Sequence, residues 1–172
     1  ANGDQTNTDA FLASQPNPLV VGDALGDACD PNDDNDLLTD LEEDINKNNA
    51  FDNNGDESNL RSPDTDGDGR IDGADNCILV NNPAQQNTDQ ELAEAGETLI
   101  VGDIEGDACD TDDDNDGLSD TFELTTSSTN PFNPDTDGDR IRDDVDNCRL
   151  VGNNDQLNTD LNLQNAGAPI VA

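Results

Sequence analysis

Acidic side chains recur in this chain at the spacing used by metal-binding loops with oxygen ligands. In residues 64–75, carboxylates stand at loop positions one, three, five, nine and twelve, and a glycine stands at position six. Residues 112–123 repeat the arrangement. An EF-hand loop draws its calcium ligands from the same positions, and its glycine allows a sharp turn. The pattern therefore predicts two calcium sites. Their ligands are Asp64, Asp66, Asp68, Asp72, Asp75, Asp112, Asp114, Asp116, Asp120 and Glu123.

Two further loops carry the acidic pattern without its glycine. Leu37 stands at position six of residues 32–43, and Arg140 stands there in residues 135–146. A side chain forced into a left-handed turn costs about 1 kcal/mol, less than a calcium site returns, so both loops are predicted sites. Their ligands are Asn32, Asp34, Asp36, Asp40, Glu43, Asp135, Asp137, Asp139, Asp143 and Asp146.

Two more sites are split by insertions of equal length, residues 10–22 and 90–102. After each insertion, three aspartates resume at the spacing of positions five, nine and twelve. The predicted ligands are Asn7, Asp9, Asp23, Asp27, Asp30, Asn87, Asp89, Asp103, Asp107 and Asp110, and a third such site begins at Asn158 and Asp160. In total the pattern predicts about six calcium ions or more.

The equal length of the insertions favours a defined excursion over a disordered loop, which remains the alternative. Thr88 and Asp89 are good caps for a helix that Gly96 would end. Residues 98–101 are predicted to form a short strand that returns the chain to the metal. Residues 9–14 and 160–165 are predicted to form matching helical turns.

Short strings around the cysteines show that the chain is a tandem repeat. Cys29 and Cys109 lie in identical Gly-Asp-Ala-Cys-Asp strings, and Cys77 and Cys148 lie in identical Asp-Asn-Cys strings. We expect a first unit at 1–62, incomplete at its N-terminus and irregular over 44–62, a second at 63–133, and the start of a third at 134–172, incomplete at its C-terminus. Arrays of this kind make contacts mainly between neighbours, so an elongated shape is expected.

Composition requires something other than an apolar core to hold the chain together. Asp and Glu number 42 against 6 Lys and Arg, the net charge is -36, and Trp, Tyr, Met and His are absent. Without metal such a chain resembles a disordered polyelectrolyte. Metal binding and folding should therefore be coupled. A surface this negative disfavours nucleic acid and anionic membranes as partners, and no apolar run is long enough to insert into a membrane.

Other classes of site fit the sequence poorly. Structural zinc would need histidine or closely paired cysteines, and both are lacking. An enzyme is not expected, because the carboxylates are better explained as metal ligands than as acid and base. No methionine-rich groove exists for a calcium sensor, and residues 124–131 cannot form the long helix that follows each loop of a dockerin. Calcium and disulfides are both stable outside cells, which predicts an extracellular protein, either processed or cut from a longer chain, since it begins at Ala1.

The strings Asp64-Thr-Asp-Gly-Asp-Gly69, Asp75-Asn-Cys77, Asn82-Pro-x-Gln85 and Gly106-Asp-Ala-Cys-Asp110 resemble the thrombospondin type 3 repeat over most of the chain. The resemblance implies a mostly irregular, calcium-stabilised repeat array with little regular secondary structure. The family lacks the inserts, in which short helical turns and short strands are expected. They are therefore candidates for a binding or assembly surface.

The resemblance also implies that cysteines pair in sequence order, so Cys77 should pair with Cys109. Cys29 and Cys148 then need partners elsewhere. Either the chain continues into more of its own array, or Cys148 of one copy bonds to Cys29 of the next, which would join copies head to tail.

Two functions remain. The first is an extracellular structural protein, a calcium-stiffened spacer or a subunit of a surface or matrix fibre. The alternative is an adhesion module that presents its inserts to a protein or glycan partner.

Overall fold

The computed structural model describes residues 6–16, 18–48 and 57–158. Over these residues the chain is mostly turns and irregular backbone, with short helices and no strand. The elements in order are α1 (Thr8–Ala13), α2 (Asp40–Glu43), the 3₁₀ helix η1 (Asp72–Ala74), α3 (Thr88–Ala95), α4 (Asp120–Phe122) and the π-helix η2 (Glu123–Ser127). The predicted irregular repeat array is therefore confirmed.

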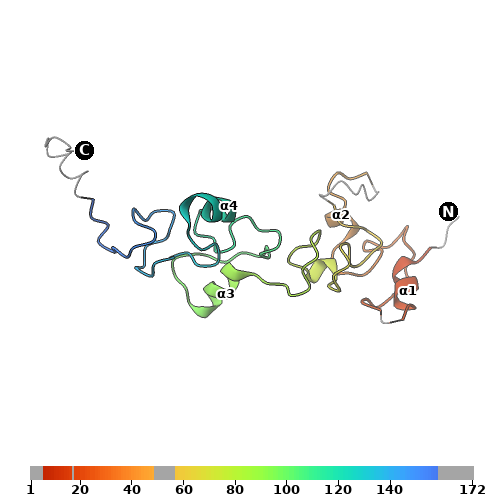
Figure 1. The fold of residues 1–172 in the computed structure, drawn as a ribbon. Helices are drawn as coiled ribbons and strands as arrows, with labels where there is room; N and C mark the ends of the chain where they lie inside the picture. Colours follow the sequence, from red (N-terminus) through yellow and green to blue (C-terminus); the bar gives the residue numbers. More distant parts are fainter. Residues whose placement is uncertain (1–5, 17, 49–56, 159–172) are drawn as a thin grey trace. The chain divides into compact units, whose positions relative to one another are not determined.

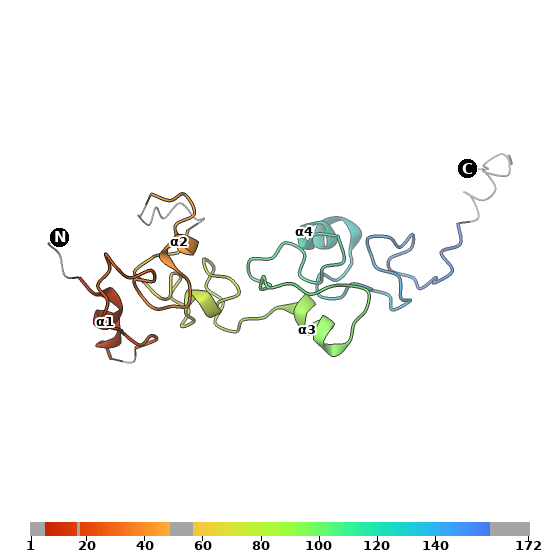
Figure 2. The same cartoon turned by 180° about the vertical axis from the view of Figure 1, so that it is seen from behind.

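The chain divides into two compact units, residues 1–86 and 87–172. Unit 1 contains α1, α2 and η1, and unit 2 contains α3, α4 and η2; in each unit the path is a series of loops with the helices at their margins (Figures 1 and 2). The repeat boundaries predicted at 62 and 133 mark where the sequence pattern recurs. They differ from this spatial division and stay a prediction.

The inserts hold the longest helices, α1 and α3. The side chains of Asn7 and Asn87 cap them by accepting hydrogen bonds from the N–H groups of Ala10 and Gln90. A helix that Gly96 ends was predicted, and Gly96 does end α3 in the left-handed conformation, with φ 99°. The predicted caps Thr88 and Asp89 are wrong by one or two residues, because Asn87 has the extended backbone that a cap requires.

The strand predicted at 98–101 does not form, since these residues have no hydrogen-bonded partner strand among the described residues. Ile100 is nevertheless buried, and so is Val20 at the same place in the first insert. One apolar side chain therefore anchors each returning segment. The helical turn predicted at 9–14 is confirmed by α1, whereas the turn predicted at 160–165 lies outside the described residues.

Carboxylates occupy the interior where other proteins place apolar side chains. Among the described residues, Val20, Cys77 and Ile100 are the buried apolar side chains. The largest fully buried side chains are instead mostly acidic: Glu43, Glu123, Asp9, Asp34, Asp36, Asp72, Asp89, Asp114, Asp116 and Asp143. An ionised carboxylate is costly to bury without a counter-charge, so this interior must be neutralised by protons or by bound cations.

Candidate metal centre

The unbroken loops close through the same backbone hydrogen bond. The N–H of the residue at position nine donates to the carbonyl oxygen of the residue just before the loop. The four bonds are Asp40 to Pro31 (2.9 Å), Asp72 to Pro63 (3.0 Å), Asp120 to Thr111 (3.1 Å) and Asp143 to Pro134 (3.1 Å). A common closure at four places means that one loop geometry is repeated along the chain.

Side-chain hydrogen bonds inside the loops fix the register. The carboxylate at position three accepts from the N–H at position five, as Asp66 does from Asp68 at 3.0 Å. The carboxylate at position five accepts in turn from the N–H at position seven, as Asp68 does from Arg70 at 2.7 Å. These Asx-type bonds hold the acidic side chains toward the loop interior.

The split sites use the same register across their inserts. Asp9 accepts from the N–H of Asp23 at 2.6 Å, and Asp89 accepts from that of Asp103 at 2.9 Å. The pair in each site therefore stands at positions three and five, although residues 10–22 or 90–102 lie between them. By the same register Asn7 and Asn87 stand at position one, where Asn32 also stands.

The ends of each insert meet, which explains how the split loops stay intact. A Cβ atom added to Gly22 would lie 2.6 Å from the Cα of Ala10, and one added to Gly102 would lie 2.7 Å from the Cα of Gln90. The insert therefore leaves and re-enters the loop at a single place, position four, and only glycine fits there.

Position six has the left-handed backbone that the acidic pattern requires. Gly69 and Gly117 have φ of 97° and 100° there, and Leu37 and Arg140 have φ of 87° and 75°. The two loops without glycine thus keep the turn and bear its strain, as the sequence predicts.

The acidic side chains converge in groups whose oxygen atoms all lie within 4.8 Å of one another. Two oxygens on opposite sides of one calcium ion are about 5 Å apart, because each Ca–O distance is roughly 2.3–2.6 Å. The groups include Asp9, Asp23 and Asp30; Asp34, Asp36 and Glu43; Asp64, Asp66 and Asp68; Asp89, Asp103 and Asp110; and Asp112, Asp114 and Asp116. Each group joins ligands predicted for one site.

Burial and mutual repulsion raise the pKa values inside these groups. Burial raises the pKa of Asp114 to about 8, and the charges of Asp116 and Glu123 add to the effect. In unit 1, burial raises the pKa of Glu43 to about 8, with the charges of Asp34 and Asp36 adding to it. A divalent cation would instead lower these pKa values, because it stabilises the ionised form of a carboxylate.

Many of these buried oxygens have no hydrogen-bond donor. Both carboxylate oxygens of Asp34 and both of Glu123 are buried and unpartnered, as is one oxygen each of Asp36, Asp66, Asp75, Asp112, Asp114, Asp116, Asp137 and Asp146. Buried polar atoms are normally satisfied. The possible ligand atoms in these groups are all hard oxygens, and they lie at the separation expected around one calcium ion. Both properties fit calcium.

The aspartates at position nine differ from the other predicted ligands in the hydrogen bonds that they accept. Asp107 accepts from the backbone N–H of Thr88 at 2.6 Å and from its hydroxyl at 2.9 Å, and Asp27 bonds to Thr8 in the same way. Thus both oxygens of this side chain help to close the loop. In an EF-hand this position often reaches the ion through water.

Sequence reasoning missed two asparagines that join neighbouring loops. The side-chain N–H of Asn35 donates to the carboxylate of Asp9 at 2.5 Å, and that of Asn115 donates to Asp89 at 2.5 Å. Each asparagine stands at position four of the loop that follows a split site. Both asparagines stand at the same position of the repeat. This recurrence is the sequence signal from which their role could have been predicted.

The predicted sites at the C-terminal end are only partly described. Residues 135–146 show the same closure as the other loops, with the N–H groups of Gly138 and Arg140 donating to Asp135 at 2.9 and 2.7 Å. Asn158 is exposed, and Asp160 lies outside the described residues.

The four cysteines fall into two classes. Cys77 and Cys109 are disulfide-bonded, whereas Cys29 and Cys148 are free and exposed. No helix among the described residues has the length and apolar character needed to cross a membrane.

Comparison with protein families matches the thrombospondin type 3 repeat at residues 51–85, 102–123 and 133–156. The matches contain three of the unbroken loops and leave out α3 with most of the insert around it. No curated protein matches the chain.

Proposed function

Because the chain contains thrombospondin type 3 repeats, a family of calcium-binding and typically extracellular modules, we propose that it is a secreted or cell-surface structural protein. In this proposal it is a non-enzymatic spacer or fibre subunit, stiffened by calcium. The observation that carries the proposal is the interior of unpartnered carboxylates. Such an interior needs bound cations to keep its carboxylates ionised.

Circular dichroism and dynamic light scattering, first with calcium and then with excess chelator, test the metal-held scaffold. We expect chelation to remove the helical signal and expand the chain, and re-addition of calcium to restore both. A hydrodynamic radius and spectrum that do not change on chelation would contradict the proposal.

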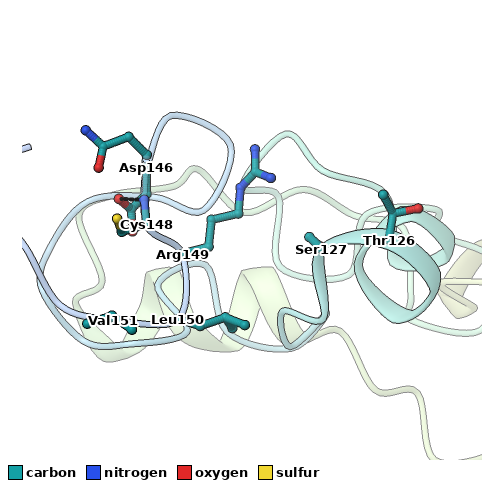
Figure 3. A pocket seen from close by; sticks show the side chains of 8 residues that line it. Thr126, Ser127, Asp146, Cys148, Arg149, Leu150 and Val151 are labelled. Atoms are coloured by element: carbon teal, nitrogen blue, oxygen red, sulfur yellow. Dashed lines mark hydrogen bonds between the residues drawn. The ribbon is translucent and has the colours of Figure 1, made fainter. Parts of the chain in front are cut away.

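The two free thiols support assembly into a fibre. Cys29 and Cys148 are both exposed, so each is accessible to a thiol of another copy. Cys148 lines an open surface pocket of 420 Å³ with Arg149, Leu150, Val151 and residues of η2 (Figure 3). A hollow beside the thiol gives room for a second chain, and joining unlike surfaces produces open, head-to-tail assemblies.

Electrophoresis without reductant tests this assembly. Wild-type protein oxidised with calcium should give a ladder of oligomers that reductant removes, and Cys29→Ser or Cys148→Ser should reduce the ladder to dimers at most. A ladder that persists in the Cys29→Ser variant would show that the two thiols do not join head to tail.

Exposed apolar side chains on the inserts favour the second candidate, a module for adhesion. Phe11 in α1 is 64% exposed, and Val21 and Val101 on the returning segments are 84% and 82% exposed. Replacing Val21 and Val101 with Ser should weaken capture of a protein or glycan partner without changing the calcium titration. Unchanged capture would show that the inserts are not part of the binding surface.

A further inference from the structure

In the four unbroken loops, position four has a left-handed backbone and holds one of two residue types. It is Asn35, Gly67, Asn115 or Gly138, with φ of 58°, 79°, 54° and 79° in that order. Glycine and asparagine are the residues that adopt such a backbone most readily. The turn therefore explains why both residues are accepted, but it does not explain which of them a given loop contains.

The residue at position four matches the kind of site that comes before the loop. Asn35 and Asn115 belong to loops that follow a split site, whereas Gly67 and Gly138 belong to loops that follow an unbroken one. A Cβ atom added to either glycine would meet nothing within 4 Å. Position four therefore borders open space in these two loops, and an asparagine is found where a split site lies beside it.

The side-chain amide of Asn115 joins the two ends of the split loop in unit 2. It donates hydrogen bonds to Asp89 at 2.5 Å, to Asp103 at 3.2 Å and to the carbonyl oxygen of Val101 at 3.2 Å. Asp89 and Asp103 are the ligand positions on the two sides of the insert. One side chain from the following loop thus holds both of them.

Unit 1 repeats this arrangement. The side-chain amide of Asn35 donates to Asp9 at 2.5 Å and to the carbonyl oxygen of Val21 at 3.1 Å. These bonds are the equivalents of two of the three in unit 2. The inserts themselves differ in sequence, so the shared contact belongs to the loop frame and to its asparagine.

The ligands of the following loop determine where the amide lies. Asn115 stands between Asp114 and Asp116, which are both fully buried, and its N–H donates to the carbonyl oxygen of Asp112 at 2.9 Å. The three aspartates form one of the acidic groups, and their carboxylates repel one another unless a cation binds. A bound ion therefore draws positions one, three and five together and fixes position four between them.

We propose that Asn115 and Asn35 are positioning residues that make calcium binding at each split site depend on calcium in the loop that follows. An ion in the following loop fixes the amide, which then holds the carboxylates across the insert in register. Without that ion the amide moves, and the split site loses its donor. By linkage, an ion in the split site favours the following loop by the same factor. The inference rests on the proposed calcium-held scaffold and adds a coupling between named sites to it.

Nuclear magnetic resonance during a calcium titration tests the coupling, because it observes each site separately. The backbone amide of Asp103, which donates to Asp89, reports on the split site, and that of Gly117, which donates to Asp112, reports on the following loop. Asn115→Gly keeps the left-handed turn and removes the amide. It should raise the calcium midpoint of the Asp103 signal about tenfold, a typical size for coupling between two sites.

Emptying the following loop distinguishes coupling from a hydrogen bond that only supports the fold. Glu123→Gln removes a ligand of that loop. It should raise the midpoint of the Asp103 signal about tenfold when Asn115 is present, and it should cause no further rise in Asn115→Gly. If Glu123→Gln leaves the Asp103 midpoint unchanged while Asn115 is present, the two sites are independent and the proposal is overturned.

Gly138→Asn is the matched control, because it places the same amide at position four of a loop that follows an unbroken one. It should leave the Asp103 midpoint unchanged, and an equal shift there would also overturn the proposal. Asn35→Gly tests the arrangement in unit 1, where the signal of Asp23 reports on the split site. It should raise that midpoint in the same way, and it serves if Asn115→Gly does not fold.

The experiment separates failure of the coupling from failure of the scaffold. If calcium changes neither the Asp103 nor the Gly117 signal of wild-type protein, the calcium-held scaffold is wrong and the coupling with it. If both signals respond to calcium but neither asparagine variant shifts its split site, the scaffold stands and the coupling alone is overturned.

Discussion

At the scale of single residues, position six shows how the chain tolerates a departure from its own pattern. Arg140 keeps a φ of 75° where glycine is the favoured residue. Its N–H still donates to Asp135 at 2.7 Å, so the loop closes in the normal way. The strain is accepted because the hydrogen bonds and the expected ion determine the backbone at this point.

Replacing Arg140 with glycine should therefore stabilise the calcium-loaded protein by about 1 kcal/mol, because glycine adopts a positive φ without steric cost. Arg140→Gln is the matched control, since it removes the same charge but keeps the strain. The two variants would be compared by urea denaturation in saturating calcium. Equal denaturation midpoints for Arg140→Gly and Arg140→Gln would contradict the inference that the backbone is strained at this residue.

Residue spacing predicted the acidic groups well because the ligands of an unbroken metal-binding loop lie close together in the sequence. Asp64, Asp66 and Asp68 are near one another in sequence, so their convergence follows from the turn alone. The contacts of Asn35 with Asp9 and of Arg61 with Asp33 could not be predicted in this way. Each joins residues far apart in the sequence, and only the folded chain shows which segments are neighbours.

At the scale of elements, the inserts are excursions from a closed loop. The helix α3 was predictable because its start and stop signals are local. The strand predicted at 98–101 was wrong, because a strand needs a partner strand and the sequence offered only residues that favour one, Thr98, Leu99, Ile100 and Val101. What brings the insert back to its origin is the close approach of Gly102 to Gln90.

Replacing Gly102 with alanine should weaken calcium binding at the split site of unit 2. The new Cβ atom would lie 2.7 Å from the Cα of Gln90, so the ends of the insert must move apart and carry Asp103 away from Asp89. Gly96→Ala is the control: its Cβ would meet nothing within 4 Å, and its positive φ costs about 1 kcal/mol at the end of α3 only.

The measurement is a calcium titration followed by circular dichroism. Gly102→Ala should shift one phase of the titration to higher calcium, whereas Gly96→Ala should lower the helical signal without moving any phase. Identical titrations for Gly102→Ala and wild type would mean that the insert closes by another route.

Removal of an insert should leave its calcium site in place. If residues 91–102 are deleted and Gln90 becomes glycine, Asp89 and Asp103 stand at positions three and five of an ordinary loop with glycine at position four. The hydrogen bond from Asp103 to Asp89 already has the geometry of such a loop. We expect equilibrium dialysis to give an unchanged number of calcium ions, and a loss of one ion would show that the insert itself supplies a ligand.

At the scale of the whole molecule, the chain replaces an apolar core with a charged one, and its folding should depend on whatever neutralises that charge. Protons and calcium ions can both do so. Glu43 and Asp114 have pKa values of about 8 in the metal-free fold, against ordinary values of 4.5 and 3.8. The folded chain without calcium therefore holds protons that the unfolded chain releases.

The sign of the pH dependence follows from these raised pKa values. Without calcium, the contribution of these groups to stability is present below about pH 4 and is lost as the pH rises toward 8. With calcium the dependence is opposite, because the ion binds only the ionised groups and competes with protons. Metal-stripped protein should thus be more compact at pH 5 than at pH 8, while calcium affinity should be higher at pH 8.

Light scattering of metal-stripped protein between pH 4 and pH 8, repeated with calcium, would measure both trends. Sodium chloride at about 1 M is the control, because it reduces the Debye length to roughly 3 Å and screens the general repulsion of a chain with net charge -36. If salt at pH 8 compacts the chain as fully as calcium does, charge screening explains the folding and specific sites are not needed. If only calcium or protons do so, the buried carboxylates themselves control the fold.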